Sequence, residues 1–299
     1  MSSTNHVRIV EVGARDGLQN EKTLLPADVK IALIDRLSST GLKTIEATSF
    51  VSPDWIPQLA DAAEVFTRIR KAPGVSYPVL VPNLQGYQRA REVGATEIAV
   101  FTAASETFSR KNTNASIDES IERFIPVIEQ AQADEVKVRG YVSTVLGCPY
   151  QGDVPISDVV RVATRLYQLG CYEISLGDTI GVGTPAKARA MLHAVAQEVP
   201  ISALAVHFHD TYGQALANIL ACLEEGVRVV DSSVSGTGGC PYAKGATGNV
   251  ASEDVVYMLH GMGMTTGIDL DLLVAAGAWL ATQLHKETAS RVTRARTAN

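Results

Sequence analysis

The sequence predicts an α/β fold, a (β/α)8 TIM barrel in which eight parallel strands alternate with helices. Three observations predict it: short β-branched runs recur along the whole chain, amphipathic helical patterns separate them, and glycines stand where helices would end. Eight such units in roughly 250 residues are the usual size of this barrel. A doubly wound open sheet is the alternative, and it would not bring all strand ends to one mouth.

The expected strands are short runs rich in valine, isoleucine and aromatic residues, as in buried parallel sheets. In chain order they are VRIVEVG (7–13), TIEATSF (44–50), YPVLVPN (77–83), TEIAVFTA (96–103), VKVRGYVS (136–143), YEISLGD (172–178), ALAVHFHD (203–210) and VRVVDSSVS (227–235).

Helices are expected between these strands because apolar residues recur there at spacings of three and four. Examples are the sets Ile121, Phe124, Ile125, Ile128 and Leu216, Ile219, Leu220, Leu223. Ser116 followed by Glu119 is a capping-box signature. Pro26 and Pro185 stand at expected helix starts, with Thr184 as a candidate N-cap. Four glycines are expected to end helices with a left-handed backbone: Gly41, Gly94, Gly170 and Gly226.

We expect a single catalytic domain over residues 1–299, with the barrel at about 7–262 and C-terminal helices at about 263–290. Apolar residues make up 46% of the chain and charged residues 19%, which is typical of a protein with a substantial core. The net charge of -6 and the lack of a basic stripe argue against a nucleic-acid partner. No apolar run reaches the roughly 18 residues needed to cross a membrane.

The expected compartment is the cytoplasm. The first strand starts at about Val7, which leaves no room for a leader peptide, and the final Thr-Ala-Asn matches no targeting tripeptide. Four scattered cysteines form no C-x-x-C pair, so reduced thiols are expected. Cys148, Cys171 and Cys222 are interpreted as small core residues.

Polar residues collect at the carboxyl ends of the expected strands, where this fold places its chemistry. They are Arg15, Asp16, Glu46, Asn83, Asp178, His207, His209 and Asp210. The last strand runs into the glycine-rich segment GTGGCPYAKGATGN (236–249), which suggests a flap that approaches a ligand closely. Asp178 could merely cap its turn, and Asp210 with Thr211 is expected to cap the next helix.

His207 and His209 are two residues apart, so on a strand they point the same way. With Asp16 and Asn249 they would form a nitrogen and oxygen ligand set for Mg²⁺ or Mn²⁺, although Zn²⁺ or Co²⁺ could also bind. The alternative is two interior histidines with ordinary hydrogen bonds. Phe208, between them, would face the outer helices.

Three other residues have candidate roles in catalysis. Arg15 would stabilise a developing negative charge, or else form a surface ion pair with Asp16. Glu46 is expected to orient Arg15 or a histidine rather than to bind metal. Cys240, in the glycine-rich segment, could carry a proton to the reaction centre, or simply fill a tight turn.

Several segments resemble the 3-hydroxy-3-methylglutaryl-CoA lyase family over nearly the whole chain. They are VEVGARDGLQNEK (10–22), IEATSFVSPDWIPQ (45–58), RGYVSTVLGCPY (139–150), YEISLGDTIGVGTP (172–185), AVHFHDTYGQALAN (205–218) and VVDSSVSGTGGCPYAKGATGNVASEDVVYML (229–259). The resemblance implies a metal-dependent carbon–carbon lyase that splits this thioester into acetyl-CoA and acetoacetate. Leucine degradation and ketone-body formation are the implied pathways, and a homodimer is the implied assembly.

By position, the resemblance implies metal ligands Asp16, His207, His209 and Asn249. It implies that Arg15, supported by Glu46, stabilises the enolate oxygen and that Cys240 is the flap cysteine that protonates the enolate carbon. His207 or Asp16 is the candidate base. The implied contacts of the acyl-CoA substrate are Arg15, Gln19, Asn112, Tyr141, Ser175 and Thr179. A terminal cysteine and a peroxisomal tripeptide found in some relatives are absent here.

Three other functions remain possible from the sequence. A related lyase could act on another 3-hydroxy-acyl-CoA. An acetyl-CoA-dependent Claisen-condensing synthase shares the R-D and H-x-H motifs but usually carries a further C-terminal domain. A metal-binding barrel without activity would be expected to lack part of this residue set.

Overall fold

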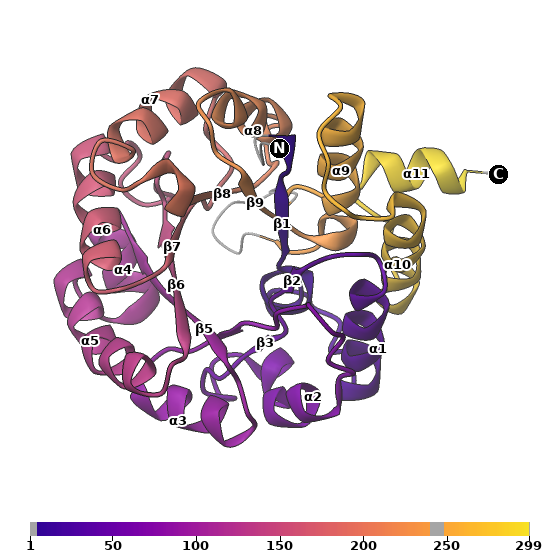
Figure 1. Ribbon diagram of the computed structural model, residues 1–299, viewed down its shortest axis with the longest axis horizontal. Coiled ribbons are helices and arrows are strands. Elements are labelled where there is room, and N and C mark those ends of the chain that lie inside the picture. Colours follow the sequence, from indigo (N-terminus) through magenta and orange to yellow (C-terminus); the bar gives the residue numbers. More distant parts are fainter. Residues whose placement is uncertain (1–4, 240–247, 299) are drawn as a thin grey trace.

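The barrel predicted from the sequence is the observed fold (Figure 1). The computed structural model describes residues 5–239 and 248–298. All strand pairs are parallel, in the order β2-β1-β9-β8-β7-β6-β5-β4-β3. The strands are β1 (Arg8–Glu11), β2 (Thr44–Ile45), β3 (Thr48–Ser49), β4 (Val79–Leu80), β5 (Glu97–Ala103), β6 (Lys137–Ser143), β7 (Glu173–Asp178), β8 (Leu204–Phe208) and β9 (Val229–Ser232).

The expected strand 44–50 is divided into β2 and β3, and this division closes the ring. β2 pairs with β1, whereas β3 pairs with β4. Between them, the Glu46 amide donates to the Glu11 carbonyl at 2.8 Å and the Ala47 amide donates to the Pro78 carbonyl at 2.9 Å. The two ends of the strand order therefore belong to one continuous segment.

The expected strand 77–83 is shorter than predicted, because only Val79–Leu80 pairs as β4. Pro78 and Pro82 flank this pair. Proline has no amide hydrogen to donate to a strand ladder, so Pro78 and Pro82 each leave a gap in it, although the Pro78 carbonyl still accepts from Ala47.

The helices surround the strands in Figure 1. They are α1 (Ala27–Ser38), α2 (Ala62–Arg68), α3 (Leu84–Glu92), α4 (Glu106–Thr113), α5 (Ile117–Ala133), α6 (Ile156–Gln168), α7 (Pro185–Val195), α8 (Ala215–Glu224), α9 (Ser252–Gly261), α10 (Leu270–Gln283) and α11 (Arg291–Thr297). Single turns are η2 (Gly13–Gly17), η3 (Pro57–Leu59), η4 (Ile201–Ala203) and η5 (Val234–Gly236). Among the described residues, no helix has the length and apolar character that a bilayer crossing requires.

Local signals in the sequence correspond to observed helix ends. Ser116 and Glu119 form the reciprocal capping box of α5. Gly41, Gly94, Gly170 and Gly226 all have positive φ, as a C-terminal glycine requires. Phe208 is 1% exposed and belongs to the apolar layer between strands and helices, as expected.

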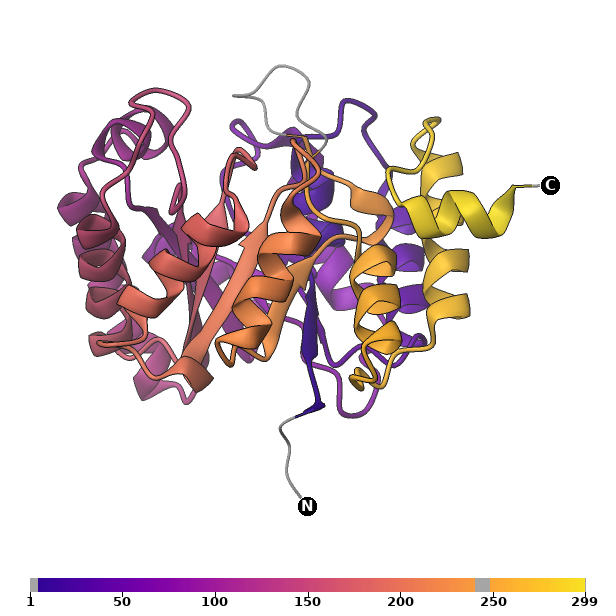
Figure 2. The same ribbon diagram turned by 90° about the horizontal axis from the view of Figure 1, so that it is seen from above.

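Helices α10 and α11 follow the barrel and lie together on one flank (Figure 2). Helix α10 packs against α1, α9 and η5. Helix α11 is docked by Asp254 of α9, whose carboxylate accepts from the amides of Arg291 at 3.0 Å and Val292 at 2.9 Å. The C-terminal segment is thus joined to the rim of the barrel.

Candidate active site

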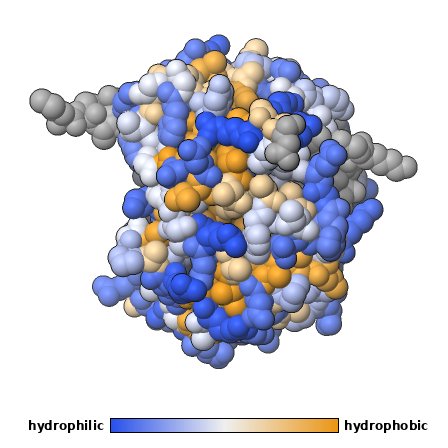
Figure 3. Space-filling view, turned by 90° about the vertical axis from the view of Figure 1, so that its right-hand side faces the viewer, coloured by the Kyte–Doolittle hydropathy of each residue, from blue (hydrophilic) through white to orange (hydrophobic). Residues whose placement is uncertain are grey.

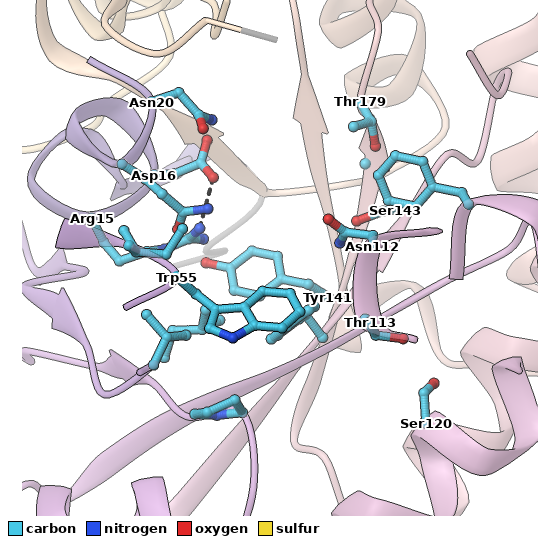
Figure 4. Close-up of a pocket in the computed structure, with 18 of the residues that line it drawn as sticks. Arg15, Asp16, Asn20, Trp55, Asn112, Thr113, Ser120, Tyr141, Ser143 and Thr179 are labelled. Atoms are coloured by element: carbon cyan, nitrogen blue, oxygen red, sulfur yellow. Dashed lines mark hydrogen bonds and ion pairs between the residues drawn. The ribbon is translucent and has the colours of Figure 1, made fainter. Parts of the chain in front are cut away.

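A cavity of about 530 Å³ lies among the segments that follow the carboxyl ends of the strands. In Figure 4, Arg15 and Asp16 occupy one side, Tyr141 lies between, and Asn112, Ser143 and Thr179 occupy the other side. Nine residues predicted from the sequence line it: Arg15, Asp16, Gln19, Asn83, Asn112, Tyr141, Thr179, His207 and His209. The fold therefore assembles residues that are distant in sequence into one site.

The turn η2 presents Arg15 and Asp16 at this cavity. Glycines at both of its ends allow close packing, because a Cβ on Gly13 would lie 2.6 Å from Glu11 Oε1 and one on Gly17 would overlap Thr237 Oγ1. The Gly13 amide also donates to Glu11 Oε1 at 2.7 Å. The GARDG sequence thus fits a turn with no room for side chains at its ends.

Arg15 is only 6% exposed and is held by two carboxylates. Its Nε donates to Glu46 Oε2 at 2.8 Å, and its Nη1 donates to Asp16 Oδ1 at 2.7 Å. Burial lowers the pKa of Arg15, but the charges of Glu46 and Asp16 outweigh burial and place its pKa above the ordinary value. Arg15 is therefore a fixed positive charge, and its ion pair with Glu46 fits the orienting role expected for Glu46.

Asp16, His207 and His209 each offer a ligand atom, and these atoms lie within 4.8 Å of one another. His209 Nδ1 is buried and has no hydrogen-bond partner within the described part of the chain. Burial, followed by the charge of His207, lowers the pKa of His209 to about 4, so its neutral ring offers a lone pair at pH 7. These features fit a divalent cation.

Asn249 lies beside the same three residues. Its Nδ2 donates to Asp16 Oδ2 at 2.8 Å and to the Thr237 carbonyl at 3.2 Å. The carbonyl oxygen of its amide is a ligand type that Mg²⁺ and Mn²⁺ accept. The structure thus brings all four predicted metal ligands together.

Other sequence expectations have mixed outcomes. Ser175 does not line the cavity: it is fully buried, and its hydroxyl donates to Asp231 Oδ2 at 2.7 Å. Asp178 caps its turn by accepting from the Gly183 amide at 2.8 Å. Asp210 accepts from the Ala215 amide at 3.0 Å at the start of α8, whereas Thr211 Oγ1 has no partner among the described residues.

Three of the four cysteine predictions can be compared with the structure. Cys148, Cys171 and Cys222 are buried free thiols, as expected. Cys240 lies outside the described residues.

Two charged residues behind the site were not predicted from the sequence. Asp231 of β9 and Arg139 of β6 are inside the barrel, 1% and 0% exposed, and form an ion pair. Asp231 also contacts His207. The predicted site residues stand at strand ends, whereas Asp231 and Arg139 lie within strands. A charged residue among valines in VKVRGYVS and VRVVDSSVS was the available signal.

Apolar side chains complete the cavity wall. Phe101, Phe108 and Phe124 line it together with Trp55, whose side chain is 71% exposed. No sequence pattern distinguished these aromatic residues from ordinary core positions. The cavity is therefore lined by both charged and apolar side chains.

Comparisons with known proteins agree with this geometry. A family model described as HMGL-like matches residues 6–279. The chain is 61% identical over 290 residues to "3-hydroxy-3-methylglutaryl-CoA lyase, cytoplasmic" of Mus musculus, covering 97% of this chain and 84% of that protein. It is 60% identical over 289 residues to "Hydroxymethylglutaryl-CoA lyase, mitochondrial" of Gallus gallus, covering 97% of each.

Among solved structures, the crystal structure of hydroxymethylglutaryl-CoA lyase from Pseudomonas aeruginosa matches with a TM-score of 0.97 and 59% identity, covering 98% of each chain. The family model spans most of the barrel, and the relatives are similar over almost the full length. The chain therefore belongs to the HMGL-like family.

Proposed function

We propose that this protein is a carbon–carbon lyase that cleaves 3-hydroxy-3-methylglutaryl-CoA into acetyl-CoA and acetoacetate. The observation that carries the proposal is the convergence of Asp16, His207 and His209 beside the buried Arg15 in one cavity. The relatives named above support the substrate and the reaction. The reaction is a retro-Claisen cleavage, which produces acetoacetate as in leucine breakdown and ketone-body formation.

Asp16, His207, His209 and Asn249 would hold the cation, for which Mg²⁺ or Mn²⁺ suits a set of nitrogen and oxygen donors. When bound, it would act as a Lewis acid toward substrate oxygens.

Arg15 stabilises the thioester oxygen as negative charge develops there. Its guanidinium is already held by Glu46 and Asp16, and its carbon lies 5.4 Å from the centre of the Tyr141 ring. Tyr141 in turn donates to Glu46 Oε2 at 3.2 Å. A donor fixed before the reaction needs no reorganisation as the charge forms.

Two protons move in the reaction. Of the two candidate bases, Asp16 takes the proton of the C3 hydroxyl, because His207 Nδ1 faces Asp231 and its Nε2 faces the metal ligands, which leaves His207 no free lone pair. The electrons of the broken carbon–carbon bond pass to the acetyl-CoA enolate. The Cys240 thiol then gives its proton to the enolate carbon. Gln19, Asn112, Tyr141 and Thr179 contact the acyl-CoA from the cavity wall.

The proposal includes a homodimer located in the cytoplasm. Figure 3 views the flank of α9, α10 and α11, where apolar surface lies between charged groups. Tyr257 of α9 is 58% exposed and Leu272 of α10 is 46% exposed. Light scattering should give twice the chain mass of 31.8 kDa, and that mass itself at assay concentration would contradict the dimer.

Purified protein supplied with 3-hydroxy-3-methylglutaryl-CoA and Mg²⁺ or Mn²⁺ should release acetoacetate. Treatment with EDTA should stop the release, and added cation should restore it. A fully metallated, folded protein that leaves this thioester intact would contradict the proposed function. Citramalyl-CoA in parallel reactions tests whether another 3-hydroxy-acyl-CoA is preferred.

A further inference from the structure

Below the proposed metal ligands, charged groups of alternating sign follow one another through the barrel interior. Arg139 of β6 donates to both oxygens of Asp231 of β9, at 2.9 and 2.7 Å. Its Nε also donates to Glu173 Oε1 of β7 at 2.7 Å, and Glu173 pairs in addition with Arg8 of β1. Asp231 is the member nearest to the cavity, because it alone contacts His207.

The strand register places Asp231 beside His207. The two residues are direct partners on the neighbouring strands β8 and β9, so their side chains project on the same face of the sheet. His207 Nδ1 lies 3.4 Å from Asp231 Oδ2. The Ser175 hydroxyl donates to that same oxygen at 2.7 Å.

These contacts determine which nitrogen of His207 faces the cavity. A carboxylate paired with arginine can only accept hydrogen bonds, so a bond to Asp231 requires the proton on Nδ1. The lone pair is then on Nε2, which lies 3.8 Å from Asp16 Oδ2. In metalloproteins, a carboxylate behind a histidine fixes its tautomer and ring orientation in this way.

We propose that Asp231, held in place by Arg139 and Ser175, is a positioning residue that directs His207 Nε2 toward the cation. The inference rests on the metal site of the proposed function. It also gives Ser175 a role: its hydroxyl supports Asp231 from below the cavity instead of contacting the acyl-CoA.

An ion pair kept only for stability would not need these additional contacts. Burying two charges costs several kcal/mol per ion, and apolar replacements are often as stable. The Arg139–Asp231 pair already satisfies both carboxylate oxygens, yet Oδ2 also faces His207 and Ser175. The contacts of Asp231 Oδ2 with His207 and Ser175 connect the ion pair to His207, a proposed metal ligand.

The first test measures the tautomer of His207 by nitrogen NMR of metal-free protein with ¹⁵N-labelled histidine. A His207→Asn variant assigns the signal among the six histidines. We expect the proton on Nδ1. A neutral His207 with its proton on Nε2 would overturn the proposal whatever the metal results.

The second test measures Mn²⁺ dissociation constants by electron paramagnetic resonance without substrate. Ser175→Ala keeps the charge pair and should weaken binding about three- to tenfold. The double variant Arg139→Gln/Asp231→Asn removes both charges and should weaken it about 10- to 100-fold. Ser232→Ala is the matched control. It also removes a buried hydroxyl, next to Asp231 on β9, but this hydroxyl bonds to Ser252 and not to Asp231.

The outcomes separate the two proposals. Wild-type affinity in Ser175→Ala and in the folded double variant would overturn the role of Asp231 and leave the lyase proposal standing. A wild-type protein that binds no Mn²⁺ would overturn both. If the double variant does not fold, the tautomer and the Ser175→Ala affinity decide the question.

Discussion

Arg15 keeps its charge inside the protein because two carboxylates surround it. Glu46 is fully buried and Asp16 is partly exposed, so Glu46 fixes the guanidinium while Asp16 faces the cavity. The two ion pairs that stabilise Arg15 also fix the orientation of its guanidinium. Arg15 therefore links the packing of η2 to the chemistry of the site.

Replacing Arg15 by glutamine should lower kcat about 10²- to 10³-fold, because a preorganised donor to the developing oxyanion is lost. The metal ligands remain, so Mn²⁺ affinity should stay within a few fold of wild type. Steady-state rates of acetoacetate release measure the first effect. Arg161→Gln, which removes only exposed ion pairs with Asp118 of α5 and Asp158 of α6, is the control. Wild-type turnover in Arg15→Gln would remove Arg15 from the mechanism.

Replacing Cys240 by alanine should lower kcat about 10²- to 10⁴-fold if its thiol protonates the enolate. Mn²⁺ affinity should not change. Cys222→Ala is the matched control, since Cys222 is buried against the core and should affect stability rather than turnover. Undiminished activity of Cys240→Ala would show that another group supplies the proton.

At the scale of elements, two buried carboxyl groups hold the turn η5 between β9 and α9. Glu253 accepts from the Ser235 amide through both oxygens at 3.0 Å, and Ser235 has a φ of 61°. Glu11 accepts from the Val234 amide at 2.8 Å. This turn precedes the segment that leads to Asn249, so the two carboxyl groups support the rim of the site.

Burial raises the pKa of Glu11 to about 7 and that of Glu253 to about 8, well above the ordinary 4.5. A raised pKa means that the folded state binds the proton more tightly than the unfolded state. The resulting stability is fully present below about pH 4.5, the ordinary pKa of glutamate. It is lost progressively as the pH rises from there through the folded-state pKa values of about 7 and about 8. Each group contributes a slope of up to about 1.4 kcal/mol per pH unit.

Glu253→Gln should therefore lessen the fall in unfolding free energy of the metal-free protein between about pH 6.5 and 8. Urea titrations at several pH values measure it, with the exposed Glu64→Gln as control. Parallel curves for wild type and Glu253→Gln would contradict a raised pKa at this position.

Across the whole molecule, local patterns predicted the barrel and the mouth of the site. Some features are determined by residues adjacent in sequence. They include the capping box of α5, the helix ends at Gly41 and Gly226, and the common direction of His207 and His209 on their strand. Since the carboxyl ends of the parallel strands meet at one mouth of the barrel, the fold itself then places Asp16 near the histidines.

Contacts between distant strands could not be predicted in this way. Whether Asp231 meets Arg139 depends on register across β6 to β9 and on which interior layer each side chain occupies. The family resemblance implied that Ser175 contacts the substrate, yet its side chain bonds to Asp231 and does not line the cavity. No sequence pattern shows which interior layer of a barrel a side chain occupies.

Anomalous diffraction from crystals grown with Mn²⁺ tests the central claim most directly. We expect one manganese peak within coordination distance of Asp16, His207, His209 and Asn249. A catalytically competent crystal form saturated with Mn²⁺ but showing no peak among these four residues would contradict the account.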